Sequence, residues 1–347
     1  MLTTAQIALL QEELRTAKNP LFLYDSDADG LCSFLLLYRI NREGKGIRVT
    51  AGSKIDGHFV RKVEEINPDK IFVLDIHVID QEFVDAVKVP VFWIDHHQPQ
   101  EIKNVHYFNP RIKDPDAYVP TSRMAYQVSQ DEADMWIATA GCLADWYMPD
   151  FIDSFIERYP ELLPEKSDLA TALYKNPVGK LVKLFFFLQK GPSPDVRKSI
   201  NILSKIKSPF EIFHQENAPG RFLHKRFEKV DAKYEEVLAQ AKKKITKSRL
   251  ILFTYNSTQW SFTANIANEL SALYPKKVII IAREKSGSMK CSMRAQHPIA
   301  GALEKALVGI EGYGGGHPHA CGAVIKEEDW LRFLENFKEE LKHASSD

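Results

Sequence analysis

The most constraining feature of this sequence is a short apolar run that ends in an acid and two histidines. Residues 91–94 are apolar, β-branched or aromatic, follow Pro90, and lead directly into Asp95, His96 and His97. This composition predicts a buried β-strand. In an open α/β sheet, ligands bind beyond the carboxyl ends of the strands, where these three side chains would lie. Taken alone, the motif fits either a metal site or a hydrogen-bonded polar turn.

A second predicted strand also runs into acids. Residues 21–24 are apolar and are followed by Asp25, Asp27 and Asp29 at alternate positions, after which residues 31–40 have helical spacing. Alternation would keep the three carboxylates on one side of an extended backbone. Close carboxylates repel one another unless a cation lies among them, which favours a metal site. The alternative is a helix cap together with solvated turn acids.

The third such strand covers residues 71–74 and is followed by Asp75 and His77. Strands that alternate with helical segments predict a parallel sheet, whose carboxyl ends lie along one edge. Acids and histidines that follow three of these strands would therefore converge. The sequence predicts an α/β fold with a polar site at that edge.

The remainder of the chain predicts further domains. Residues 151–207 are amphipathic and helical, with breaks at Pro and Gly, and a long charged helix is expected near residues 220–247. Strands and helices alternate again from residue 249. We predict three parts. Residues 1–207 form an N-terminal catalytic domain with a parallel sheet and a helical subdomain (151–207). Residues 208–247 form a helical connector, and residues 248–347 form a smaller C-terminal α/β domain.

A glycine run in the C-terminal part suggests a binding loop. Gly314, Gly315 and Gly316 precede His317. Consecutive glycines are costly to order, so a compact domain keeps them where the backbone turns sharply or approaches something closely. The bare N–H groups of such a loop can bind an anionic oxygen. With Arg294 on a nearby predicted strand, phosphate binding is favoured over an ordinary loop.

Composition limits the classes of function. The 46 basic and 46 acidic residues balance, so the chain lacks the overall positive charge of a duplex-DNA binder, although a local basic groove is allowed. The four cysteines are scattered and form no C-x-x-C pair, which favours a reducing compartment over a disulfide framework or a zinc ribbon. No signal-peptide pattern or bilayer-length apolar run is present. We expect a cytoplasmic protein without membrane association.

Together these segments resemble the DHH phosphoesterase superfamily, in the branch with the DHH-associated C-terminal domain. That branch includes RecJ-type exonucleases, oligoribonucleases (nanoRNases) and cyclic-dinucleotide phosphodiesterases. The resemblance covers most of the chain and rests on D-S-D-A-D-G, the strand-end Asp75, D-H-H, A-G-C-L-A-D ending in Asp145, S-M-R-A, and G-G-G-H-P-H-A-C-G-A. The helical stretch at residues 176–191 is most similar to archaeal RecJ-like members.

The resemblance implies two divalent metal ions, usually Mn²⁺, with Mg²⁺ or Co²⁺ as possible substitutes. By position, Asp27 would hold one ion, Asp75 would bridge both, and the other ion would be held by Asp29, His96 and Asp145. Many members have a metal-binding histidine where this chain has Leu23, so we expect Asp25 to complete the first set. Oxygen and imidazole ligands suit Mn²⁺, and two metals can clamp both oxygens of an in-line displacement.

The resemblance also implies roles around the metals. His97 would face the scissile phosphate, with Asp75 and Asp95 in the same catalytic group, and a metal-bound water would attack. In the interdomain cleft, a terminal phosphate would be bound by Ser292, Arg294, Gly315, Gly316 and His317. His77 stands where a glycine is frequent. We expect it to donate a hydrogen bond to a metal ligand, with direct ligation or simple packing as the alternatives.

These observations favour an Mn²⁺-dependent exonuclease that hydrolyses single-stranded RNA or DNA from an end. The neutral net charge and modest size favour an alternative, a nanoRNase or a phosphoesterase for cyclic or linear dinucleotides or a nucleoside bisphosphate. A non-catalytic replication or repair scaffold is the third hypothesis, and the intact aspartates argue against it. No residue pattern indicates the sugar preference, the polarity of digestion, any repair or replication partner, or the oligomeric state.

Overall fold

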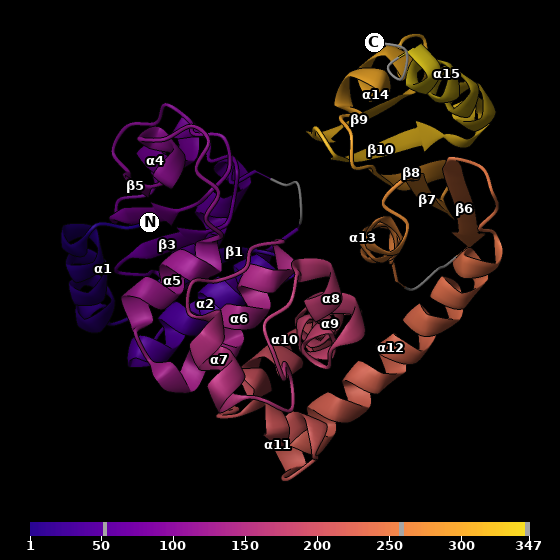
Figure 1. Ribbon diagram of the computed structural model, residues 1–347. Coiled ribbons are helices and arrows are strands. Elements are labelled where there is room, and N and C mark those ends of the chain that lie inside the picture. The colour runs from indigo at the N-terminus through magenta and orange to yellow at the C-terminus, as the bar shows by residue number, and fades with distance from the viewer. Residues whose placement is uncertain (51–53, 257–259, 344–347) are drawn as a thin grey trace. The chain divides into compact units, whose positions relative to one another are not determined.

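The computed structural model describes residues 1–50, 54–256 and 260–343 (Figure 1). The chain divides into two units, Met1–Glu228 and Lys229–Asp347. Helix α12 (Ala218–Lys243) crosses this division, which falls inside the segment predicted as a connector. Within the described residues, no helix is both long enough and apolar enough to cross a membrane. The two units are described in turn.

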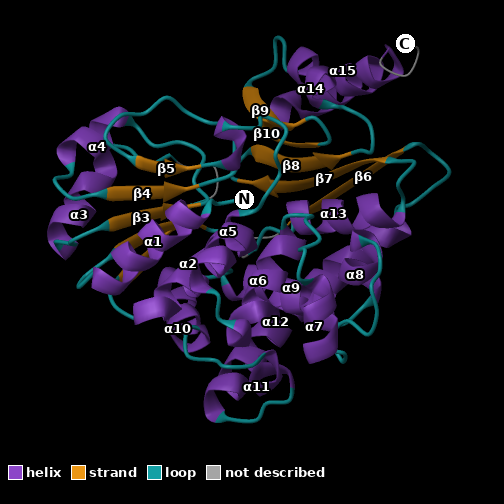
Figure 2. Cartoon of the chain, turned by 60° about the vertical axis from the view of Figure 1, so that its left-hand side comes forward, coloured by secondary structure: helices purple, strands orange, loops and turns teal. Residues whose placement is uncertain are grey.

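A five-stranded parallel sheet forms the centre of the first unit, as the sequence predicts. Figure 2 shows β3, β4 and β5 side by side. The strand order is β2-β1-β3-β4-β5. The strands are β1 (Leu21–Asp25), β2 (Lys45–Val49), β3 (Ile71–Leu74), β4 (Val91–Ile94) and β5 (His106–Phe108). The sequence did not predict β2 and β5, because these edge strands are short or polar and lack a continuous apolar run.

The central strands are apolar on both faces because helices cover both faces. On one face, aliphatic side chains and Trp93 pack with α3 (Val60–Ile66) and α4 (Gln81–Ala86). On the other face, Phe22 and Phe72 have ring centroids 5.3 Å apart, and Phe72 and Phe92 have ring centroids 5.1 Å apart. With both faces covered and the strands parallel, the side chains that follow the strand ends lie at one edge of the sheet.

The aromatic face of the sheet packs against α2 (Ala28–Asn41), since Phe22 contacts Phe34 of that helix. Helix α2 also packs against α1 (Thr4–Thr16), α5 (Thr121–Ser129), α6 (Met135–Ala144) and α9. Residues 151–207, predicted as the helical part, contain α7 (Ile152–Arg158), α8 (Leu169–Lys175), α9 (Val178–Leu188) and α10 (Ser193–Leu203). The short helix α11 (Pro209–Phe213) follows, in the segment predicted as the connector.

The second unit is a mixed sheet with helices, which confirms the predicted second α/β domain. Its strand order is β6-β7-β8-β10-β9, and only β6 and β7 pair in parallel. The core on one face includes residues of α14 (Ala300–Ala306) and α15 (Trp330–His343), while α13 (Thr263–Leu273) contacts β7 and β8. The strands are β6 (Leu250–Asn256), β7 (Val278–Lys285), β8 (Ser288–Arg294), β9 (Gly312–His317) and β10 (Ala320–Lys326).

The predicted glycine loop is wrong. Gly314, Gly315, Gly316 and His317 belong to the edge strand β9, which pairs antiparallel with β10. Because β9 is mostly glycine, few side chains can hold it in place, and its backbone is ordered by pairing with β10. Glycines have low strand propensity, so the sequence pattern could not reveal this strand.

Candidate metal centre

The first acidic loop joins β1 to α2. Asp25 is the last residue of β1, Asp27 caps the amino end of α2, and Asp29 lies in the first turn of the helix. The Oδ1 of Asp27 accepts the backbone N–H of Gly30 at 2.9 Å. The backbone is therefore helical from Ala28, and the extended alternation predicted for the three aspartates is wrong beyond Asp27.

Two close contacts keep this loop tight. A Cβ atom at position 30 would lie 2.6 Å from the carbonyl oxygen of Asp25, so only glycine lets α2 start this near the strand end. On the other side, the side-chain amide of Gln189 donates a hydrogen bond to the carbonyl oxygen of Asp27. Both contacts hold the acids at the carboxyl end of β1.

Asp29 is buried and receives three hydrogen bonds from the start of α5. Its carboxylate accepts the backbone N–H of Thr121 at 2.8 Å and that of Ser122 at 3.0 Å, and it also accepts the Ser122 hydroxyl. The amino end of a helix attracts negative charge. These donors orient Asp29 and offset part of the cost of burying a carboxylate.

Asp75 follows β3 in a left-handed backbone conformation, with φ +61°. Few residues other than glycine adopt it, and aspartate and asparagine are among those that do. The backbone N–H of Asp75 donates to the carbonyl of Ile94 at 3.0 Å, and the hydroxyl of Thr121 donates to its Oδ1 at 3.3 Å. A strained backbone held by such contacts is typical of functional sites.

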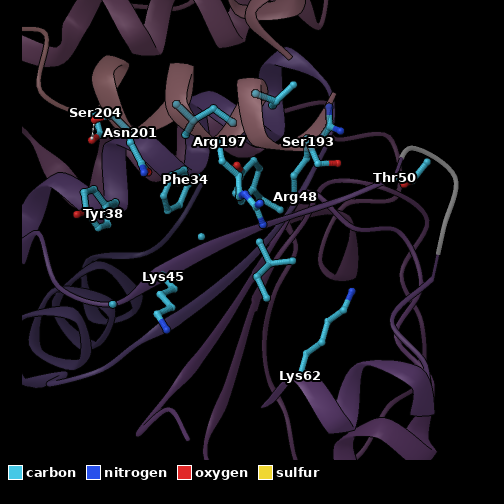
Figure 3. A pocket seen from close by; sticks show the side chains of 16 residues that line it. Phe34, Tyr38, Lys45, Arg48, Thr50, Lys62, Ser193, Arg197, Asn201 and Ser204 are labelled. Carbon is cyan, nitrogen blue, oxygen red and sulfur yellow. Dashed lines mark hydrogen bonds between the residues drawn. The ribbon is translucent and has the colours of Figure 1, made fainter. Parts of the chain in front are cut away.

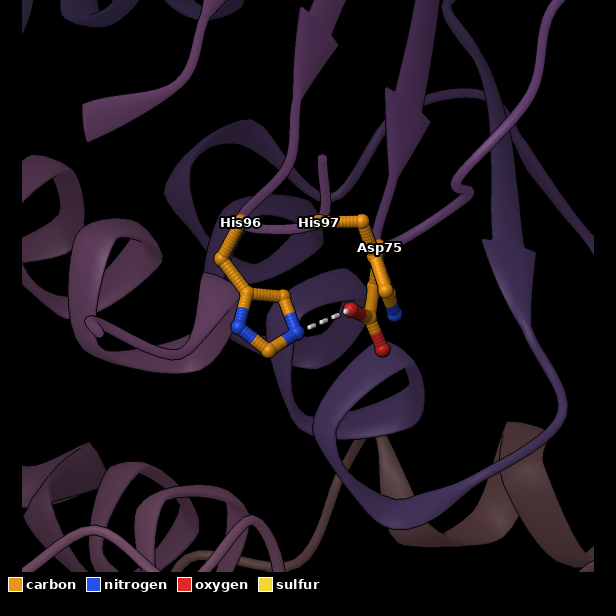
Figure 4. Close-up of side chains that lie close together, drawn as sticks. All are labelled: Asp75, His96 and His97. Carbon is orange, nitrogen blue, oxygen red and sulfur yellow. Dashed lines mark ion pairs between the residues drawn. The ribbon is translucent and has the colours of Figure 1, made fainter. Parts of the chain in front are cut away.

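His96 lies between two of the carboxylates. Its Nε2 is 3.3 Å from the Oδ1 of Asp75 and 3.4 Å from the Oδ2 of Asp145. Figure 4 shows His96 and Asp75 directed toward one another. Asp145 caps the carboxyl end of α6, and the hydroxyl of Tyr118 donates to its Oδ2 at 3.1 Å. The histidine of one strand end therefore meets the acids of another strand and of a helix end.

The predicted ligands form overlapping groups whose candidate ligand atoms lie within 4.8 Å of one another. Asp75 belongs to two of the groups. The groups are Asp25, Asp27 and Asp75; Asp29, His96 and Asp145; and Asp75, His96 and His97. The structure thus brings together all six residues predicted to bind metal.

The electrostatics of this cluster fit divalent cations. Burial raises the pKa of Asp25 to about 7, and the nearby charge of Asp27 contributes. Burial also raises the pKa values of Asp29 and Asp75 well above the ordinary range, with further increases from neighbouring carboxylates. Carboxylates that destabilise one another in a buried cluster need protons or cations between them. Oxygen and imidazole donors suit Mn²⁺ or Mg²⁺.

His96 is suited to ligation. Burial lowers its pKa, so the ring is neutral at neutral pH, as metal binding requires. Its Nδ1 is buried and has no hydrogen-bond partner among the residues that the structure describes. The polar contacts of this ring are therefore made through Nε2, which lies near Asp75 and Asp145.

His97, a member of the third group, pairs with Asp95, which belongs to none of the groups. The Nδ1 of His97 lies 2.7 Å from the Oδ1 of Asp95, which is fully buried. Burial opposes protonation of His97, but the hydrogen bond and charge of Asp95 outweigh it and raise the pKa of the ring. His77 lies beside His97, with ring centroids 5.8 Å apart, and belongs to none of the three groups.

Four of the predicted phosphate-binding residues, Ser292, Arg294, Gly315 and His317, lie on one face of the second unit's sheet, whereas the register of Gly316 with Cys321 places Gly316 on the opposite, core face. Cross-strand register places Arg294, Ala320 and His317 in one row, and Ser292, Gly322 and Gly315 in the next. The Nε of Arg294 donates to Asn268 at 2.6 Å, and the hydroxyl of Ser292 donates to Thr263 at 3.0 Å. A Cβ atom at Gly315 would meet nothing within 4 Å, so the sheet surface there is open.

Sequence reasoning missed several residues of these sites. Thr121 and Ser122 donate hydrogen bonds to Asp29, but in the sequence they indicate only the start of an ordinary helix. Arg283, in β7, is 7% exposed, and its Nε has no hydrogen-bond partner among the described residues. Register places it opposite Lys290 on the face that carries Ser292. The available signal was a basic residue directly after the apolar run of β7.

Comparison with known proteins agrees with this geometry. The sequence profile of the DHH family N-terminal domain matches residues 22–145, and that of the DHHA1 domain matches residues 247–343. The two profiles together cover more than half of the chain. Among curated proteins, none matches.

Several solved structures share the fold. RecJ from Thermus thermophilus in complex with Mn²⁺ is 16% identical with a TM-score of 0.70, and the match covers 98% of this chain and 54% of RecJ. The chain thus spans about half the length of that protein. CDC45 from Entamoeba histolytica is 10% identical with a TM-score of 0.52, and the match covers 96% of this chain and 97% of CDC45. The pGpG-specific phosphodiesterase PggH from Vibrio cholerae is 14% identical with a TM-score of 0.50, and the match covers 94% of this chain and 99% of PggH.

Proposed function

Because this chain belongs to the DHH phosphoesterase superfamily, we propose that it is a two-metal phosphodiesterase that removes nucleotides from one end of single-stranded RNA or DNA. One arrangement carries the proposal: Asp75 belongs at once to the group of Asp25 and Asp27 and to a group with His96. A carboxylate shared in this way suits two ions that act on one phosphate.

The chain's own side chains supply both ion sites in this proposal. Asp25, Asp27 and Asp75 would hold one ion. The second ion would be held by Asp29, His96 and Asp145, with Asp75 shared. When bound, the ions would neutralise phosphate charge. They would also lower the pKa of a water, so that it could lose a proton and act as the nucleophile at neutral pH. We propose Mn²⁺ as the preferred ion because the set mixes carboxylates with an imidazole.

His97 would contact the scissile phosphate. Since its Nδ1 pairs with Asp95, the Nε2 is left to donate a hydrogen bond to a phosphate oxygen. Asp95 would act through His97 by fixing the tautomer and the ring orientation. The sheet face with Ser292, Arg294, Gly315 and His317, together with the backbone of the neighbouring Gly316, would bind a terminal phosphate. Recognition of an end would favour removal of terminal nucleotides.

A second candidate is a phosphodiesterase for dinucleotides or very short oligonucleotides. The match to PggH spans nearly the whole length of both proteins. The balanced charge also gives the chain no overall positive charge to hold a long strand, although a local basic groove is allowed.

One assay separates these functions. Labelled RNA and DNA ladders, from dimers to about 30-mers, would be incubated with metal-free protein and with protein given Mn²⁺, Mg²⁺ or Co²⁺. Progressive shortening of long strands supports the exonuclease, whereas loss of only the shortest oligomers supports the second candidate. His96→Ala should be inactive, and His106→Ala, an exposed histidine outside the groups, should be active. Absence of cleavage with every metal and substrate would contradict both.

A further inference from the structure

A cavity of about 690 Å³ lies along the edge strand β2 in the first unit (Figure 3). Residues of β2, α2 and α10 border it, and Lys62 of α3 also lines it. This volume is in the range of sites that bind small molecules or a nucleotide. The cavity contains none of the acids of the metal centre, although Tyr24, the neighbour of Asp25, lines it.

The charge of the lining is one-sided. Lys45, Arg48, Lys62 and Arg197 line the cavity, and its sixteen described lining residues include no aspartate or glutamate. None of these four cations forms an ion pair with a carboxylate among the described residues. Because the chain as a whole is neutral, this excess reflects local placement and would attract an anion such as phosphate.

Aromatic rings also line the cavity. Phe34 and Tyr38, one turn apart on α2, have ring centroids 5.4 Å apart, and both line the cavity. Strand β2 can lie against them because residue 46 is glycine: a Cβ atom there would be 2.5 Å from the Phe34 ring. Rings flanked by cations suit a nucleotide, since bases stack on rings and phosphates pair with lysine or arginine.

Arg48 links the cavity to the metal centre. In the sheet register, Arg48 pairs with Tyr24 and the next residue of β2 pairs with Asp25. Arg48 donates to the carbonyl of Gln189 at 2.6 Å, and Gln189 in turn donates to the carbonyl of Asp27. The end of the cavity at Arg48 therefore adjoins the first acidic loop.

We propose that this cavity binds a phosphodiester-linked nucleotide of a single-stranded nucleic acid while another part of the strand reaches the metal centre. This inference rests on the proposed function, and it adds a contact that a dinucleotide phosphodiesterase would not need. The strand's phosphates pair with Lys45, Lys62 and Arg197, and a base lies over the ring of Tyr38.

The test is binding of a fluorescent single-stranded oligonucleotide to the full chain in EDTA, followed by anisotropy over a range of salt concentrations. Lys45→Glu/Arg197→Glu should weaken binding at least tenfold. Removal of the two cations should also reduce the slope of log K against log salt by about 0.7 for each lost phosphate contact. Lys88→Glu, which changes an exposed lysine just before β4, should bind as the wild type does.

Two further measurements separate this inference from the proposed function. Hydrolysis of bis(p-nitrophenyl) phosphate with Mn²⁺ should be equal in the wild type and in the double variant, since this diester is too small to span cavity and centre. If the double variant binds oligonucleotide with unchanged affinity and slope, the inference is overturned, whatever the hydrolysis. Binding of 5′-AMP as tight as that of the oligonucleotide, and lost in the double variant, would also overturn it, because the cavity would then be a site for a free nucleotide.

Discussion

The Nδ1 of His97 lies 2.7 Å from the Oδ1 of Asp95, and the other oxygen of this carboxylate accepts the backbone N–H of His97 at 3.1 Å. Asn109 and Tyr107 approach the same Oδ2 at 3.4 and 3.5 Å. Asp95 is thus saturated with donors and joins none of the groups suited to metal. The first residue of the Asp-His-His motif orients the third, while the second faces the carboxylates.

Asp95→Asn should therefore impair turnover without removing metal. We expect kcat to fall about 100-fold or more, with a small change in KM, because the neutral amide no longer fixes the protonated Nδ1 of His97. Asp95 raises the pKa of His97, so the basic limb of the pH–rate profile should move to lower pH. Steady-state kinetics over pH and calorimetric titration with Mn²⁺ would check this. Equal losses of metal affinity and activity would show that Asp95 supports the metal sites.

Asp75→Asn separates the charge of this residue from its backbone conformation. Without metal, the variant should melt at a higher temperature than the wild type, because one of the mutually repelling buried carboxylates is gone. Mn²⁺ should no longer raise its melting temperature. Asp75→Ala should be less stable than Asp75→Asn by about 1–2 kcal/mol, since alanine tolerates φ +61° poorly. Equal stability of the two variants would contradict the role assigned to the backbone.

The metal-free protein should lose stability as the pH rises. The folded-state pKa values of Asp25, Asp29 and Asp75 lie above the ordinary value of 3.8, and that of Asp25 is about 7. Protonation therefore stabilises the folded state below pH 4, and this contribution is lost as the pH rises through the folded pKa values. Thermal melts in EDTA should shift downward between about pH 4 and 8.

Saturating Mn²⁺ should reverse this trend. Ligands must be deprotonated to bind metal, so the increase in melting temperature on adding Mn²⁺ should grow with pH over the same range. If the increase in melting temperature caused by Mn²⁺ were the same at every pH, the assignment of these acids as ligands would be contradicted. His96→Ala is the matched variant and should retain the decline in EDTA with a smaller response to metal.

Residue pattern was sufficient for the centre of the sheet and for the acids at its edge. Residues 21–24, 71–74 and 91–94 are buried on both faces, so their apolar runs predict strands, and parallel pairing makes the following acids converge. The edge strands β2 and β9 were missed. One carries lysine and arginine and the other is mostly glycine, so neither has the alternation or propensity that marks a strand.

The contacts that orient the ligands could not be predicted from local pattern. Thr121 is 92 residues from Asp29, whose carboxylate it binds, and Tyr118 is 27 residues from Asp145. These pairs depend on how α5 and the loop before it pack on α2 and α6, which is a tertiary property. The same limit applies to Arg283, whose burial is set by its neighbours on β6 and β8.

Arg283 provides the last prediction. It is 7% exposed, its Nε has no hydrogen-bond partner, and it forms no ion pair with an acid among the residues that the structure describes. A buried guanidinium without an anion is unfavourable, so a site that keeps one is suited to an anionic ligand. Arg283→Leu should thus be at least as stable as the wild type in thermal melts. It should raise KM about tenfold for oligonucleotides that carry a terminal phosphate, and leave KM unchanged for the same oligonucleotides without it. Arg249→Leu, at an exposed position just before β6, is the control. A destabilised Arg283→Leu with equal KM values for both substrates would show that the guanidinium has only a structural role.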